Sequence, residues 1–399
     1  MTGDMAREAD RYVRPSAFEI AVCWMHGVDP PTAVPPTSKS PRDALDDAIR
    51  PALIGGPCFV TFSGGRDSSA VLAAATELAR RDGLPDPIPV TRTYPGIPES
   101  DESEWQRLVI DHLGLREWVR LEFRHGETDL LGDAAREGLL GRGVVWPPAL
   151  QVQSTVYRHL DAGSMLTGEG GDETLGARRV TPLTLLQKRL RTRQRPTRTL
   201  LAWAARSVQP GPLRRALGRA ELGGSAVQSW LQPEVLRHHH ALVAHDDATE
   251  PLAYDNAVWW VTRKRNWATL DHNQAVAAAE YGVRAINPLL DHGFLAALAH
   301  FGGRWGFAGR TATMKALFSD VLPVDVLSRS TKARFNGAYS GEATREFAES
   351  WDGSGVDPEL VDVDRLRQMW LSDSPTASTA LLLHSAWLAA QPTAQRAAS

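Results

Sequence analysis

Two glycine-rich turns carry the side chains in this sequence whose types and spacing could do chemistry. The first turn follows the apolar run 58–62 and reads Ser63-Gly64-Gly65-Arg66-Asp67-Ser68-Ser69. Its glycines let the backbone pass close to an anion, its serines add hydroxyl donors, and a following helix would point N–H groups at the same anion. Asp67 would repel a phosphate unless a divalent cation lay between them. The turn therefore predicts a polyphosphate site with Mg²⁺ on Asp67, and a capped strand-to-helix connection is the plainer alternative.

The second turn is dense in acids. It follows the apolar stretch 164–167 and reads Gly168-Glu169-Gly170-Gly171-Asp172-Glu173. Three carboxylates in one turn need a reason, and one reason is a metal. Asp172 could join Asp67 in holding Mg²⁺, while Glu169 would be placed to accept a proton. A solvated acidic loop is the alternative.

Strand and helix patterns alternate around these turns. We predict strands over residues 58–62, 88–94, 118–123 and 164–167, and helices over 68–81, 101–113 and 148–160. Such alternation is typical of an α/β fold with a doubly wound parallel sheet and helices on both faces. Ligands of these sheets bind beyond the carboxyl ends of the strands, where Ser63 falls.

The chain is expected to divide into four parts. Residues 1–50 form an N-terminal extension with a proline-rich stretch, 51–177 the α/β core, 178–250 a basic helical connector, and 251–399 a helical C-terminal part. Basic residues occur from Arg178 to Arg219 with no acid among them. This stretch predicts a solvated connector or, alternatively, a docking surface for an acidic partner such as a peptide.

Composition narrows the class of protein. The chain has 399 residues, 43% of them hydrophobic, and a formal net charge of -3. This charge gives no general electrostatic case for binding nucleic acid or an anionic membrane. No apolar run reaches the length of a signal peptide or a membrane span, so we expect a cytoplasmic protein. Cys23 and Cys58 are too few for a disulfide framework or a zinc site.

The two turns together resemble those of the asparagine synthetase family. The first is similar to the pyrophosphatase loop (PP-loop) of enzymes that split ATP into AMP and pyrophosphate, and Gly-Glu-Gly-x-Asp-Glu is a hallmark of the family's synthetase half. The resemblance implies the adenine nucleotide α-hydrolase-like fold, ATP and Mg²⁺ as cofactors, Asp67 and Asp172 as metal ligands, and Glu169 as the base. It also implies that the nucleotide contacts Phe62, Ser63, Gly64, Gly65, Asp67, Ser68, Ser69, Thr91, Thr167 and Gly168.

Two later stretches extend the resemblance, each with a departure. Residues 281–291 are similar to a family element in which Glu and Arg stand at the positions of Arg284 and Ile286, so the acceptor side of the pocket is expected to be rebuilt. Residues 329–335 resemble an Arg-x-Lys-x-x-Phe sequence with one extra residue. The resemblance implies that Lys332 has the catalytic lysine role.

The resemblance implies an amide ligase that adenylates a carboxylate and transfers it to an amine. Thr2 stands where a glutaminase domain would begin with cysteine, so we expect no glutamine hydrolysis. The β-lactam branch of the family has Tyr in place of Glu169, and the variant around Arg284 is closer to lasso-peptide macrolactam synthetases. The alternatives are a tRNA-modifying enzyme that uses the basic stretch, and a non-catalytic partner protein.

Overall fold

The computed structural model describes residues 12–124, 126–223, 228–331, 333, 336–339, 341–372 and 377–392. Its strands are β1 Cys58–Thr61, β2 Ile88–Thr93, β3 Val119–Glu122, β4 Gly163–Leu166 and β5 Val283–Ile286. Its helices before residue 180 are α2 Ala17–Val22, α3 Pro41–Ile54, α4 Arg66–Asp82, α5 Ser103–Leu113, α6 Asp133–Arg142, α7 Ser154–Tyr157 and α8 Gly171–Thr174.

The later helices are α9 Thr181–Arg191, α10 Arg198–Ser207, α11 Gly211–Gly223, α12 Pro233–Ala248, α13 Tyr254–Trp260, α14 Arg265–Ala279, α15 His292–Gly302, α16 Arg310–Phe318, α17 Val324–Ser328, α18 Asn336–Tyr339, α19 Glu342–Ser350, α20 Val363–Trp370 and α21 Ala380–Ala389. Short 3-10 helices are η1 Pro98–Ser100, η2 Pro148–Val152, η3 Val261–Arg263, η4 Pro288–Leu290 and η5 Ala377–Thr379.

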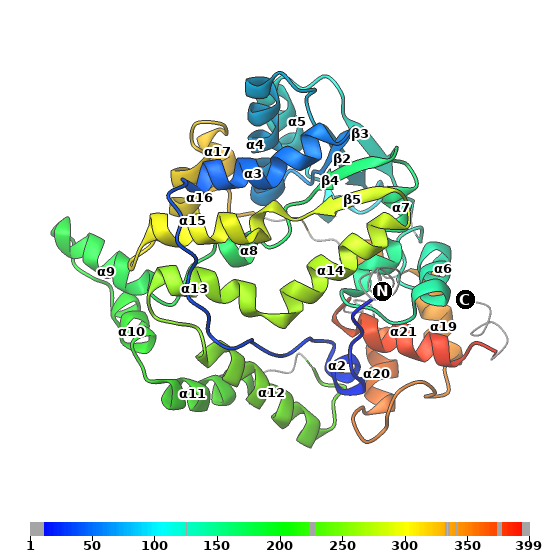
Figure 1. Cartoon of the computed structure of the whole chain (residues 1–399). Helices are drawn as coiled ribbons and strands as arrows, with labels where there is room; N and C mark the ends of the chain where they lie inside the picture. Colours follow the sequence, from blue (N-terminus) through cyan, green and yellow to red (C-terminus); the bar gives the residue numbers. More distant parts are fainter. Residues whose placement is uncertain are drawn as a thin grey trace, which may run out of the picture.

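The strands form one five-stranded parallel sheet in the order β3-β2-β1-β4-β5 (Figure 1). The predicted α/β fold with a doubly wound parallel sheet is confirmed. Strand order reverses between β1 and β4, where Val60 pairs with Leu166. Since the two strands end almost level, the turns that follow them meet at the topological switch point, the usual ligand crevice of such sheets.

Helices cover both faces of the sheet. On one face α3, α4, α5 and α15 contribute to a large apolar core with Val60 and Leu166. On the other face Phe59, Tyr157 and Met165 pack with Ala278 of α14. Phe59 and Val60 are buried on opposite faces of the sheet because side chains alternate along a strand. The sheet is therefore shielded on both sides and can hold its carboxyl edge rigid.

Two expectations about the elements are wrong. The region after residue 252 is not wholly helical, because Val283–Ile286 forms β5 beside β4. This run is only four residues long, too short to show a strand period. The helix expected over 148–160 is broken into η2 and the short α7. There Gln151 donates to the carbonyl of Gly143 over 2.7 Å, a contact eight residues back along the chain that helical periodicity does not reveal.

A second apolar core joins the two ends of the described chain. It contains Ala21 and Val22 of α2, Trp370 of α20 and Trp387 of α21. In Figure 1, α2 lies beside α20 and α21. The expected boundary at residue 50 falls inside α3, which packs on α4. The division of the chain into four parts stays a prediction.

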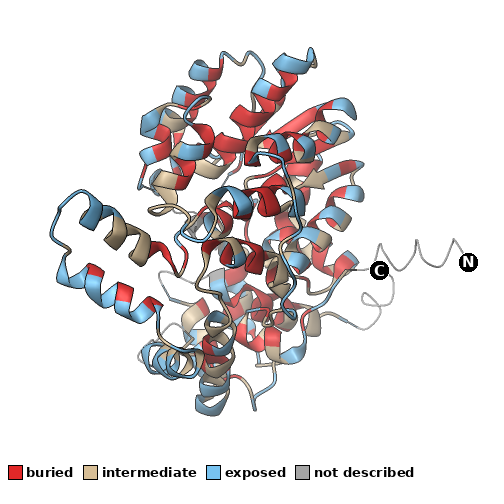
Figure 2. Ribbon diagram, turned by 60° about the vertical axis from the view of Figure 1, so that its left-hand side comes forward, coloured by how far each residue is buried: buried red, intermediate tan, exposed pale blue. Residues whose placement is uncertain are grey.

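A helical arm, defined as α9, α10 and the loop between them, projects from the body (Figures 1 and 2). Arginines at its base bind protein groups: Arg178 lies 3.9 Å from Glu250 in an ion pair, and Arg179 donates to the carbonyl of Ser207. Arg191, Arg193, Arg195 and Arg198 at its far end are exposed. None of the helices in the described ranges has the length and apolar character needed to cross a membrane.

Candidate active site

The first turn is held in shape by its own polar groups. Gly64 has φ +81°, a conformation that favours glycine, and a Cβ added there would be crowded 3.0 Å from Gln106 Cγ. The Ser63 and Ser68 hydroxyls lie 3.2 Å apart, and Ser63 Oγ also accepts from the Gly65 N–H over 3.3 Å. Helix α4 begins at Arg66, within the predicted turn and two residues before the predicted start at 68, and aims its first N–H groups beyond the strand end.

The hydroxyls of Ser69 and Thr91, behind this turn, differ in their hydrogen bonding. Ser69 is fully buried, and its hydroxyl finds no partner among the described residues. The Thr91 hydroxyl donates to the carbonyl of Phe62 over 2.7 Å and accepts from Trp118 Nε1 over 2.9 Å. Because both functions of this hydroxyl are used by the protein, the structure places Thr91 as a support for Phe62, not as an open donor.

Glycines in the second turn let it pack directly on the first. A Cβ at Gly168 would lie 2.7 Å from the backbone N of Ser68, and one at Gly171 would lie 2.3 Å from Asp67 Cγ. Gly170 has φ +80° and precedes the one-turn helix α8. No larger residue fits at Gly168 or Gly171 without moving the start of α4. The structure thus brings together the two turns that the sequence separates.

The carboxylates of Asp67 and Asp172 are bridged by the guanidinium of Arg310. Arg310 Nη2 lies 2.5 Å from Asp67 Oδ2, and Arg310 Nη1 forms an ion pair with Asp172 Oδ1. Asp67 Oδ1 is buried and accepts no hydrogen bond from the described residues. These carboxylates fit Mg²⁺, which is usually held by one or two carboxylates together with phosphate and water. Within the described ranges there is no cluster of three or more His, Cys, Asp or Glu that could form a complete metal cage.

The third acid of the turn, Glu173, forms an ion pair within the protein. Glu173 accepts from Lys264 Nζ over 2.6 Å. Burial opposes the charge of Glu173, but Lys264, together with Arg178 and Trp267, outweighs burial and lowers the pKa of this carboxyl. Lys264 in turn lies 5.0 Å from the centre of the Trp260 ring. Glu173 therefore anchors α8 to the start of α14.

Glu169 lies in the second turn, between β4 and α8. Its N–H donates to Thr167 Oγ1 over 3.1 Å, and Thr167 is bonded to Asn287. Arg92 of β2 is close enough to Glu169 for their charges to interact. Burial opposes the charge of Arg92, but nearby tyrosines and Glu169 outweigh it and raise the pKa of the guanidinium. The sequence did not single out Arg92, although an arginine at the end of an apolar strand was a signal.

Arg329 was also missed as a site residue. Its Nη1 donates to the carbonyl of Gly64 over 3.0 Å, it pairs with Glu102, and its guanidinium lies 4.6 Å from the centre of the Trp105 ring. Arg329 and Glu102 are each 7% exposed. Lys332 lies outside the described residues, so its predicted role is not placed, but Thr331 accepts from Arg329 Nε over 2.9 Å.

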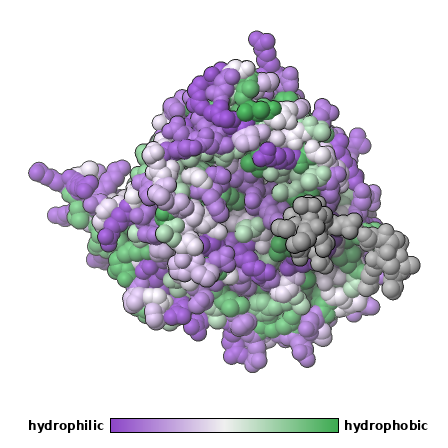
Figure 3. All heavy atoms as spheres, viewed as in Figure 1, coloured by the Kyte–Doolittle hydropathy of each residue, from purple (hydrophilic) through white to green (hydrophobic). Residues whose placement is uncertain are grey.

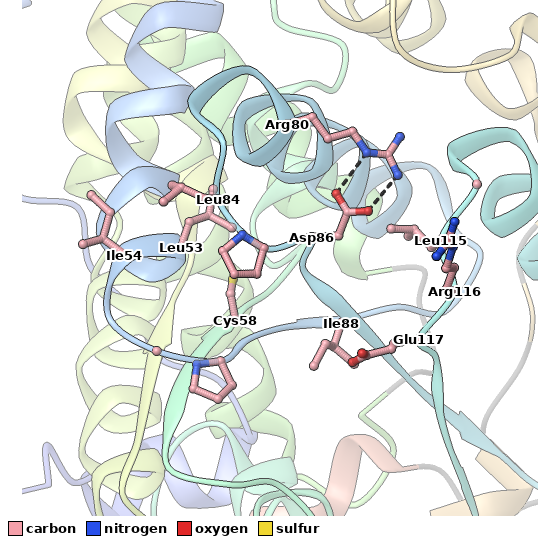
Figure 4. Close-up of a pocket in the computed structure, with 14 residues that line it drawn as sticks. Leu53, Ile54, Cys58, Arg80, Leu84, Asp86, Ile88, Leu115, Arg116 and Glu117 are labelled. Carbon is pink, nitrogen blue, oxygen red and sulfur yellow. Dashed lines mark hydrogen bonds and ion pairs between the residues drawn. The ribbon is translucent and has the colours of Figure 1, made fainter.

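A surface cavity of about 790 Å³ lies elsewhere (Figure 4). Cys58 and Ile88, which line it, begin β1 and β2. The cavity is therefore at the amino edge of the sheet, opposite the two turns. Burial raises the pKa of the Cys58 thiol to about 12, so it is no reactive nucleophile. We assign this cavity no part in the candidate site.

The sheet order and the paired glycine turns define a nucleotide-binding α/β protein of the PP-loop type. A family model described as asparagine synthase matches residues 41–390. The chain belongs to the asparagine synthase family. No curated protein matches the sequence. Family membership indicates ATP-dependent amide-bond ligase activity, a carbon–nitrogen ligase that uses ATP and acts on a carboxylate and an amine.

Proposed function

We propose that this protein is an AMP- and pyrophosphate-forming amide ligase of peptide or natural-product biosynthesis. The observation that carries the proposal is the direct packing of the two turns. A Cβ at Gly171 would lie 2.3 Å from Asp67 Cγ, so the nucleotide loop and the acidic loop form one site. Hydrogen-bond donors for phosphate, the carboxylates of Asp67 and Asp172, and Glu169 then surround a single reaction centre.

The proposed reaction has two steps. Ser63, Ser68 and the first N–H groups of α4 bind the phosphates of ATP while a substrate carboxylate attacks the α-phosphorus, which gives an acyl-adenylate and pyrophosphate. Asp67 and Asp172 would hold Mg²⁺, which supplies charge neutralisation for the leaving pyrophosphate. An amine then displaces AMP. Glu169 accepts its proton, and Lys332 stabilises the charge on the phosphate and the tetrahedral centre.

The peptide-cyclising branch of the family is the class of substrate we favour. Arg284 is exposed on β5 beside β4, where the family usually has Glu. The neighbouring Asn287 is buried, and its Nδ2 donates to Asp271 over 2.9 Å and to Gln274 over 3.0 Å. This network fixes the strand end that faces Thr167. The changed charge on β5 supports an acceptor other than ammonia, and the presence of Glu169 supports chemistry other than β-lactam closure.

We also propose that the far end of the arm docks an acidic segment of a peptide or protein. Its exposed cations accompany Leu190, which is 60% exposed, and Trp203, which is 57% exposed. Figure 3 shows hydrophilic and hydrophobic side chains side by side on this projection. No acid lies between Arg178 and Arg219, so the arm cannot neutralise its own charge.

The nature of the products tests the reaction directly. Purified protein is incubated with Mg²⁺, ATP and short peptides that carry an acidic side chain and a free amino terminus. We expect AMP and pyrophosphate in equal amounts, together with loss of one water from a peptide that serves as substrate. Formation of ADP and phosphate in step with amide formation would contradict the proposal.

A further inference from the structure

The Arg310 bridge between Asp67 and Asp172 is incomplete in its hydrogen bonding. Asp67 Oδ1, an acceptor, and Arg310 Nε, a donor, are both buried without a partner among the described residues. Buried polar groups normally have hydrogen-bond partners, so two buried atoms of one ion pair that lack them require an explanation. A divalent cation would satisfy the carboxylate oxygen, and a phosphate oxygen would satisfy the guanidinium N–H. One ligand, a metal-bound polyphosphate, supplies both.

Arg310 stands where the cation is expected. Its two terminal nitrogens contact one carboxylate each, so the guanidinium neutralises the pair in the nucleotide-free protein. A divalent cation placed on the same oxygens would repel it at close range. The arginine must therefore leave when the metal enters, and the nearest strong anion would then be the polyphosphate that arrives with the metal.

The local fold allows this movement of the side chain without movement of the helix. Arg310 opens α16 directly after Gly309, which has φ +95°. The next residue, Thr311, is held by Arg66, whose Nη1 donates to the Thr311 hydroxyl over 3.3 Å. Arg66 lies close enough to Arg310, Arg329 and Asp67 for its charge to interact with theirs at the first turn. When a metal takes over Asp67 and Asp172, the guanidinium groups of Arg310 and Arg66 would suit an anion of high charge, such as pyrophosphate.

We propose that Arg310 is a pyrophosphate-binding residue that holds the cation position until Mg·ATP arrives, when its guanidinium transfers from Asp67 and Asp172 to the phosphates. The inference rests on the proposed function because it requires a metal–nucleotide complex. It adds an order of events: the nucleotide-free protein excludes the metal, and metal and nucleotide enter together.

Binding of Mn²⁺ without nucleotide tests the first half. Free Mn²⁺ is followed by electron paramagnetic resonance with the wild-type protein, Arg310→Met, Arg310→Lys and the matched control Arg345→Met. We expect Arg310→Met to bind Mn²⁺ at least about tenfold more tightly than the wild type, because its carboxylates are released. Arg310→Lys, which keeps a charge but cannot span both carboxylates, should lie between them, and Arg345→Met, which removes an exposed arginine paired with Glu349 on α19, should match the wild type. Equal affinity in the wild type and both Arg310 variants would overturn the proposal.

Binding of a non-hydrolysable ATP analogue with Mn²⁺ tests the second half. Calorimetry should show analogue affinity about 10- to 100-fold lower in Arg310→Met, because a charge-assisted contact to the phosphates is lost. Unchanged affinity would overturn the transfer to pyrophosphate. A wild-type protein that binds no analogue at all would contradict the proposed function instead, and the Mn²⁺ comparison would still decide whether Arg310 holds the cation position.

Discussion

Arg329 ties the first turn to the start of α5. It contacts the Gly64 carbonyl, the carboxylate of Glu102 and the face of Trp105. A buried charge pair of this kind costs desolvation energy, and its net worth to stability is small. The loss of one partner is costly, because the other charge stays buried alone. The pair therefore acts as a lock on the geometry of the nucleotide loop.

Arg329→Met should lower the free energy of unfolding by about 3–5 kcal/mol, because it strands the Glu102 carboxylate. The double variant Glu102→Gln/Arg329→Met removes both charges and should recover part of that loss. Urea unfolding of the wild type, Glu102→Gln, Arg329→Met and the double variant measures both effects. The account would be wrong if the double variant were as unstable as the sum of its single variants.

Most of the chemistry-bearing residues could be recognised from the sequence because they are neighbours within two short turns. Asp67 and Asp172 are predicted by their glycine-rich surroundings, and in the structure both carboxylates form ion pairs with Arg310. Arg310 and Arg329 could not be found in this way. Each reaches the first turn from a helix or loop more than two hundred residues away, so only the packing of α16 and α17 reveals them.

The arm of α9 and α10 buries few of its residues. Of α10, only Leu200, Ala204 and Ser207 are buried, and of α9 only Thr181. Isolated helices of this length are marginal in water, so packing between the two helices and their base must support the arm. An exposed amphipathic hairpin of this kind suits a partner that covers it.

Reversal of charge at the far end of the arm should weaken binding of an acidic peptide. The probe is a labelled synthetic peptide of Glu and Leu, and fluorescence anisotropy measures its affinity. Arg191→Glu/Arg195→Glu should reduce affinity about tenfold or more, with a strong salt dependence, because charge complementarity is lost. The matched control Arg215→Glu/Arg219→Glu, on α11, should change it little. Equal weakening by both variants, or preference for anionic lipid vesicles over the peptide, would exclude the proposed partner.

Among the elements, the long regular ones were the most predictable. Helix α4 is rich in alanine and ends at Gly83, which has the left-handed conformation typical of a helix C-terminus. Strand β5 was missed because its pairing partner, β4, lies more than a hundred residues away along the chain. A four-residue strand is specified by that partner and by burial, which local periodicity does not report.

At the scale of the whole molecule, sheet order is what creates the site. The turns after β1 and β4 are about a hundred residues apart in sequence, yet Val60 and Leu166 pair side by side. Helices on both faces bury this junction. The C-terminal helices α16 and α17 contribute side chains to the apolar core that contains Val60 and Leu166. The sequence predicted the parallel sheet, but the adjacency of β1 and β4 depends on global topology.

Exchange of labelled pyrophosphate into ATP tests the central claim that the two turns form one adenylation site with a separate base. The assay uses a peptide substrate with the wild-type protein, Asp67→Asn and Glu169→Gln. Asp67→Asn should abolish both exchange and amide product, because it removes a carboxylate from the cation position. Glu169→Gln should keep exchange while amide product falls by about two to four orders of magnitude. Loss of exchange and product together in Glu169→Gln would contradict the account, because that carboxylate would then belong to the nucleotide site.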